Sequence, residues 1–144
     1  MSRWERFGFS MEIDGAAVRD WYARAGEWDC GCGHCRNFLK LARARALPAP
    51  VLEFLDGLSV PPERSTYVCE LDRVGDKLYY QVNYRLPGKK LAGPERDSVN
   101  QGWGGVWCGD DPYPYGAPGF PKPHFDVSFF VWLPWVLDEP PEGE

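Results

Sequence analysis

The sequence predicts a single α+β domain with a mostly antiparallel sheet of four to six strands and two short helices. The helices follow a cysteine knuckle, defined as residues 28–35. The chain has 144 residues, the usual size of one domain, and 44% of them are hydrophobic, enough for a sizeable core. Segments of alternating apolar and polar residues flank two stretches with helical periodicity, and short turns join them. We expect the domain to span 1–137, followed by an acidic Pro/Glu tail over 138–144.

The first element is a predicted strand over 5–13. Its apolar residues recur at period two, at Phe7, Phe9, Met11 and Ile13. Asp14-Gly15 follows, a preferred pair for a two-residue hairpin turn, so we expect a second strand over 17–23. A helix is the alternative prediction for this second segment, because four apolar residues also share a helical face: Val18, Trp21, Tyr22 and Ala25.

Two helices are predicted next, over 34–46 and 50–58. The first has an apolar face made by Cys35, Phe38, Leu39 and Ala42. Its opposite face is basic and contains Arg36, Lys40 and Arg43. Pro48 and Pro50 separate the two helices, and Pro61-Pro62 closes the second.

The rest of the chain predicts strands. Period-two patterns over 67–72 and 78–86, joined by a turn at 74–76, predict a hairpin in which Cys69 is a core thiol. A short strand is expected near 103–108, followed by a long loop rich in Gly, Pro and aromatic residues. The last strand, over 124–133, is apolar on both faces towards its end. We therefore expect it to lie centrally and to be covered on both sides.

Three of the five cysteines lie within six residues, at Cys30, Cys32 and Cys35. Because we see no signal peptide, we expect a reducing cytoplasm, where clustered thiols favour metal or redox chemistry over disulfides. Zinc prefers soft sulfur ligands in a tetrahedral arrangement, and Gly31 and Gly33 allow the backbone to wrap an ion. The knuckle therefore predicts a structural zinc site.

A fourth ligand is not evident from the spacing. Cys108 is our first choice, because it ends a Gly-Trp segment at the start of a polar loop. The alternatives that stay open are Cys69, His124 and a carboxylate such as Asp29. His34 is too close in sequence to Cys32 and Cys35 to complete a tetrahedron easily, so we expect it at the surface or beside the ligands. Two other interpretations of the three thiols also stay open: reduced thiols without metal, and a redox or iron–sulfur role.

The stretch Asp29-Cys30-Gly31-Cys32-Gly33-His34-Cys35-Arg36-Asn37-Phe38 resembles a signature of small uncharacterised bacterial proteins. Their pattern is Asp-Cys-x-Cys-x-x-Cys-Arg-Asn-aromatic, with a later Phe-Leu pair and a C-terminal Trp-Val-Leu. The corresponding residues here are Phe54-Leu55 and Trp135-Val136-Leu137. The resemblance implies that the three thiols act as a unit, and it implies no activity.

The charge pattern limits the partners. The net charge is −5, and Lys122 is the one basic residue after position 100. This balance argues against nucleic acid and anionic membranes, although a local basic face can still make such a contact. No apolar run is long enough to span a membrane.

We see no convincing catalytic constellation. The sequence therefore favours a non-catalytic cytoplasmic interaction module with a protein partner. Its expected binding residues lie in the aromatic loop and on the basic helix face, at Trp103, Trp107, Tyr113, Tyr115, Arg36, Lys40 and Arg43. The alternative is a thiol-based redox or metal-handling protein that uses the three clustered cysteines.

Overall fold

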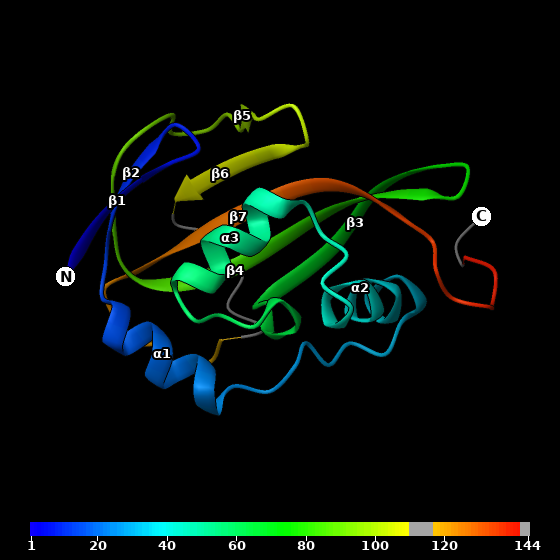
Figure 1. Cartoon of the computed structure of the whole chain (residues 1–144), viewed down its shortest axis with the longest axis horizontal. Helices are drawn as coiled ribbons and strands as arrows, with labels where there is room; N and C mark the ends of the chain where they lie inside the picture. The colour runs from blue at the N-terminus through cyan, green and yellow to red at the C-terminus, as the bar shows by residue number, and fades with distance from the viewer. Residues whose placement is uncertain (110–116, 142–144) are drawn as a thin grey trace.

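A layer of helices packs against one face of an antiparallel sheet in the computed structural model, which describes residues 1–109 and 117–141 (Figure 1). The predicted α+β class is confirmed. The described sheet has seven strands, more than the four to six expected, and each described strand pair is antiparallel. The strand order is β1-β2-β4-β7-β6-β5, and β3 also pairs with β4.

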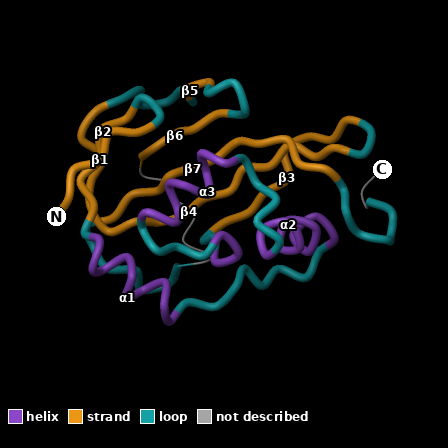
Figure 2. Tube along the Cα trace, in the orientation of Figure 1, coloured by secondary structure: helices purple, strands orange, loops and turns teal. Residues whose placement is uncertain are grey.

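The strands are β1 (Ser2–Arg6), β2 (Phe9–Ile13), β3 (Tyr67–Val74), β4 (Lys77–Ala92), β5 (Val99–Asn100), β6 (Gly105–Gly109) and β7 (His124–Pro134). The helices are α1 (Gly15–Arg24), α2 (Gly33–Arg43), α3 (Ala49–Gly57) and the short 3₁₀ helix η1 (Pro62–Arg64). Figure 2 shows that a long loop without regular structure joins α1 to α2. This loop contains the first half of the knuckle.

The N-terminal prediction was wrong in both elements. A turn divides the expected strand over 5–13 into β1 and β2, and Asp14 caps a helix instead of turning a hairpin. Its side-chain Oδ1 accepts from the Ala17 N–H at 3.1 Å, and α1 follows with Val18 and Tyr22 buried. The hairpin turn lies earlier, at Phe7-Gly8, where φ is 60° and 89°. Both central residues of this two-residue turn therefore have positive φ, as type I′ geometry requires.

Helices α2 and α3 confirm the two predicted helices to within a few residues, and α1 is the additional one. The predicted apolar face of α2 is buried throughout. It packs with α3 against alternate residues of β4 and β7. These residues form one continuous core face and include Leu78, Tyr80, Val82, Tyr84, Phe129 and Val131.

The prediction for β7 was right about its position and wrong about which part is covered. The strand lies between β4 and β6, but Trp132 near its end is 44% exposed. The residues buried on the second face are the polar Asp126 and Ser128 in the first half. Near the end of β7, α2 and α3 pack only on the core face, so the aromatic residues of the other face stay open.

A buried ion pair joins the two central strands. Arg85 of β4 and Asp126 of β7 lie directly opposite each other in the register. The guanidinium donates from Nε to Oδ1 at 3.0 Å and from Nη2 to Oδ2 at 2.9 Å. The two side chains are 6% and 2% exposed, so each charge depends on the other for its stabilisation.

We predict that Asp126→Ala destabilises the domain by about 3–5 kcal/mol, because it leaves the Arg85 charge buried without its carboxylate. Replacing both residues together, as in R85M/D126L, is expected to recover most of this loss. The free energy of unfolding from urea titration measures both effects. A single variant as stable as the parent would show that the pair does not hold the strands together.

Candidate metal centre

The three knuckle cysteines come together at the N-terminus of α2. Their Sγ atoms lie within 4.8 Å of one another, and they form the one group of metal-ligand side chains found in the described part of the chain. Cys32 is the N-cap residue of α2, and Cys35 lies in its first turn. The thiols are therefore near the backbone N–H groups of a helix start, which favour negative charge.

The three thiols differ in exposure. Cys30 is exposed, Cys32 is half-buried, and Cys35 is buried in the core. The Sγ atoms of Cys30 and Cys32 are 3.2 Å apart. On the core side, the indole N–H of Trp28 donates to Cys35 Sγ at 3.1 Å. The cluster thus spans the boundary between the interior and solvent.

The environments of the thiols shift their pKa values in opposite directions. The backbone N–H of Cys32 lowers the pKa of Cys30. Burial raises the pKa of Cys32, and it raises the pKa of Cys35 despite the bond from Trp28. A cation is the natural compensation for three thiolates in such a place, because metal ligation requires and stabilises the deprotonated form.

His34 and Glu70 extend the cluster on its sheet side. The His34 ring nitrogens lie 3.4 Å (Nε2) and 3.6 Å (Nδ1) from Cys32 Sγ. Nδ1 is also 3.5 Å from Glu70 Oε2 on β3. The Tyr80 hydroxyl on β4 donates to the His34 carbonyl at 2.7 Å, which ties the start of α2 to the sheet.

Glu70 was not among the residues that the sequence analysis selected. Its parity gave no signal, because the prediction of Cys69 as a core thiol puts Glu70 on the opposite face. In the structure Glu70 shares the core-facing side of β3 with Val68, where a carboxylate is unusual. Trp28 was seen as part of the knuckle, but its role as a donor to Cys35 depends on how the loop folds back over α2.

Cys108, the first choice for a fourth ligand, is not brought to the other three thiols. It is buried on β6 with its Sγ 3.9 Å from Met11 Sδ, and burial raises its pKa to about 12. The strand continues to Gly109 and pairs with β7, so Cys108 lies in the ladder rather than at the start of the loop.

The two other distant candidates also lie apart from the group. Cys69 is half-buried on β3 with its Sγ 3.5 Å from the Glu70 carbonyl, instead of in the core as predicted. His124 begins β7 and packs against Phe120.

The basic face of α2 is occupied by the chain itself. The Arg36 guanidinium forms a two-bond ion pair with the Glu139 carboxylate, and Lys40 donates to the Val136 carbonyl at 3.2 Å. Arg43 pairs with Glu27. The cations of this face are therefore engaged in intramolecular contacts while their side chains stay largely exposed, and the start of the acidic tail docks on α2 through Glu139.

Two of the four expected aromatic binding residues lie in the described part of the chain, and both are half-buried. Trp103 and Trp107 are half-buried and pack against the core, and the Trp107 indole N–H donates to the Glu95 carbonyl at 3.1 Å. Tyr113 and Tyr115 lie outside the described residues.

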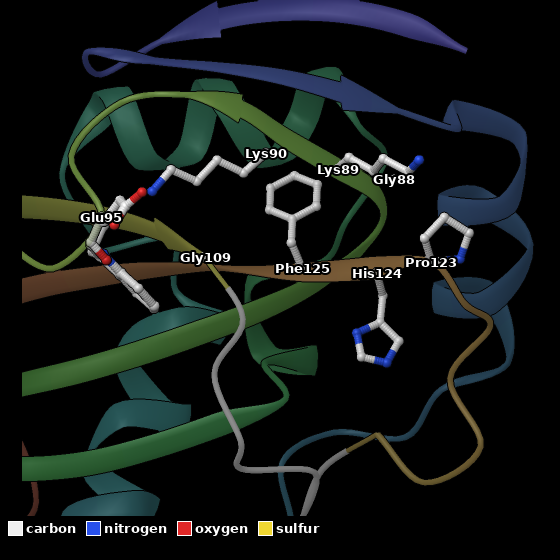
Figure 3. Close-up of a pocket in the computed structure, with 9 residues that line it drawn as sticks. Gly88, Lys89, Lys90, Glu95, Gly109, Pro123, His124 and Phe125 are labelled. Atoms are coloured by element: carbon white, nitrogen blue, oxygen red, sulfur yellow. The ribbon is translucent and has the colours of Figure 1, made fainter.

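A cavity lies away from the thiols, at the end of the sheet where β7 begins (Figure 3). Its volume is about 500 Å³, and its charged or titratable lining residues are Lys89, Lys90, Glu95 and His124. Lys90 is already engaged there, because its Nζ donates to the Pro94 carbonyl at 2.5 Å. None of the three clustered cysteines lines this cavity.

Comparisons of the chain with protein-family models, with curated proteins and with solved structures found no match. The resemblance carried by the knuckle signature therefore stays a prediction. Among the described residues, no helix is long and apolar enough to cross a bilayer. The geometry of the thiol cluster is thus the main evidence on function.

We predict that, in chelator-treated protein, Cys30 is alkylated first. It is the exposed thiol, and its lowered pKa gives it more thiolate at a given pH. Cys35 and Cys108 are expected to react only after denaturation, because both are buried and have raised pKa values. Peptide mass spectrometry after timed iodoacetamide labelling measures the order, and first labelling of Cys35 would contradict this geometry.

Proposed function

We propose that this chain is a small non-catalytic binding domain whose fold is held by one zinc ion on Cys30, Cys32 and Cys35. The observation that carries the proposal is the convergence of three thiols within 4.8 Å at a helix N-terminus. Thiolates of this number and spacing suit zinc, which has no redox chemistry and favours sulfur in structural sites.

We propose His34 as the fourth ligand on its distance to Cys32 alone, since its ring nitrogens are not within 4.8 Å of all three Sγ atoms. A zinc–sulfur bond of about 2.3 Å and a zinc–nitrogen bond of about 2.0 Å, at a tetrahedral angle, separate the two ligand atoms by about 3.5 Å. The distances from Cys32 Sγ to the His34 nitrogens are 3.4 and 3.6 Å. Glu70 is placed as the carboxylate that commonly orients a metal-bound histidine.

The ion would have a clear structural task. Residues 25–32 have no helix or strand, and one bond that holds them is the donation from the Trp28 N–H to the Glu63 carbonyl at 3.1 Å. Metal ligation by Cys30 and Cys32 would fasten this loop to α2, where Cys35 is already part of the core. Because unfolded chains rarely hold a preformed site, binding free energy becomes folding free energy.

We predict about one zinc per chain in protein purified without chelator, measured by elemental analysis. Cys32→Ser is expected to lose the metal and to lower the melting temperature, because it removes a central ligand. Cys69→Ser is the matched control and keeps both. Metal-free protein that melts at the same temperature as the parent would contradict a structural zinc site.

Glu70→Gln tests the role of His34. If Glu70 orients the metal-bound imidazole, the variant is expected to bind zinc about 10–100-fold more weakly in chelator competition. Glu53→Gln on the exposed side of α3 is the control for loss of one negative charge. Equal zinc affinity of the parent, Glu70→Gln and Glu53→Gln would show that Glu70 does not orient His34 on the metal.

A second candidate function, thiol redox or metal handling, is favoured by one observation. Cys30 is exposed, and its sulfur is 3.2 Å from that of Cys32. Such a pair can give two electrons and two protons to oxidised glutathione and form a disulfide. Resistance of the zinc-loaded protein to this oxidant excludes the redox function, and rapid oxidation supports it. Both a metal-bound and a redox-active set of reduced cysteines fit a reducing compartment such as the cytoplasm.

A further inference from the structure

Two stacked aromatic rings lie on the face of the sheet opposite the core. Tyr79 of β4 and Trp132 of β7 are directly opposite in the register, with ring centroids 5.0 Å apart and planes inclined by 33°. Phe130 lies 6.5 Å from Tyr79 at the same inclination. Trp132 is 44% exposed, which is unusual for so large an apolar side chain. The rings therefore form an aromatic surface open to solvent.

A cavity of about 320 Å³ adjoins this surface. Tyr79, Trp132 and Trp103 supply its aromatic lining, and three glycines leave it hollow: Gly102, Gly104 and Gly105. A Cβ on Gly104 would lie 2.4 Å from the Phe130 carbonyl oxygen, so the close approach of β6 to β7 requires glycine there. Its volume is at the lower end of the range of small-molecule sites.

Polar groups of two residues complete the lining. Asn100 Oδ1 accepts from the Gly102 N–H at 2.8 Å, which orients the side-chain amide. Ser98 contributes a hydroxyl on the same side. These groups supply donors and acceptors beside the aromatic rings. The cavity thus combines flat apolar surface with hydrogen-bonding groups at its edge.

The charge of the cavity limits its ligand. No charged side chain is among the described residues that line it. A phosphate or carboxylate would find no cation there, and the chain as a whole has a net charge of −5. A neutral ligand with a flat apolar face and hydroxyls at its rim fits these conditions, and a sugar ring has this form.

We propose that the cavity beside Tyr79 and Trp132 binds a short neutral saccharide. A sugar ring would stack on the aromatic surface and hydrogen-bond to Ser98 and Asn100. A proline-rich peptide also docks on aromatic grooves, extended at about 3.1 Å per residue, so it is the competing ligand in the test. The proposal is independent of the zinc site.

The test uses the full chain as purified and isothermal titration with four neutral trisaccharides, built of glucose, mannose, xylose or N-acetylglucosamine. Decaproline and a thymidine decanucleotide are titrated in parallel. The protein variants are Trp132→Ala, Asn100→Asp and the control Leu71→Ala, which removes a 47%-exposed apolar side chain outside the cavity. Circular dichroism confirms the fold of each variant.

We expect at least one trisaccharide to bind with a dissociation constant of about 1 mM or tighter. Trp132→Ala should weaken it about tenfold or more by removing the stacking surface, and Leu71→Ala should leave it unchanged. Asn100→Asp, which keeps the shape and the acceptor, should also weaken binding; it serves as the second variant if Trp132→Ala misfolds.

The proposal is overturned by binding of no trisaccharide, by binding of decaproline or the oligonucleotide alone, or by affinity unchanged in folded Trp132→Ala and Asn100→Asp.

Discussion

The register between β4 and β7 is the constraint on which the rest of this structure depends, and the buried pair of Arg85 and Asp126 holds it. A slip of β7 by one residue would turn Asp126 into the apolar core face and leave Arg85 buried without that carboxylate. The same register alternates the faces of β4, so Tyr80 points to α2 while Tyr79 meets Trp132 on the other side. The candidate metal centre and the aromatic surface therefore depend on one strand pairing.

The metal centre is attached to this frame at several points. Tyr80 holds the first turn of α2 through the His34 carbonyl. Buried Asn37 donates to the Tyr80 hydroxyl and to the Pro134 carbonyl, and it accepts from the Val136 N–H. The end of β7 and the following segment are thus bonded to the helix that carries the thiols. Metal ligation by Cys30 and Cys32 would strengthen the attachment of the loop before α2, which Trp28 and Glu27 already bond to that helix.

Features that depend on residues close together in the chain are predicted by the sequence. The three thiols come together because only one or two residues separate them, and helix α2 starts within the knuckle. The apolar face of α2 and the hairpin of β3 and β4 follow from their periodicity. At Asp14 the local signal had two meanings, since aspartate favours both hairpin turns and helix N-caps. Packing of Val18 and Tyr22 decided for the helix.

The sequence by itself determined the α+β class, the unit of three thiols and the central place of β7. Only the tertiary structure decided that Cys108 is buried beside Met11, that the basic face of α2 binds its own C-terminal segment, and that Glu70 stands beside His34. It also placed Tyr79 against Trp132 across two strands. The physical reason is range: periodicity and spacing act within a few residues, whereas these contacts depend on the register of strands far apart in the chain.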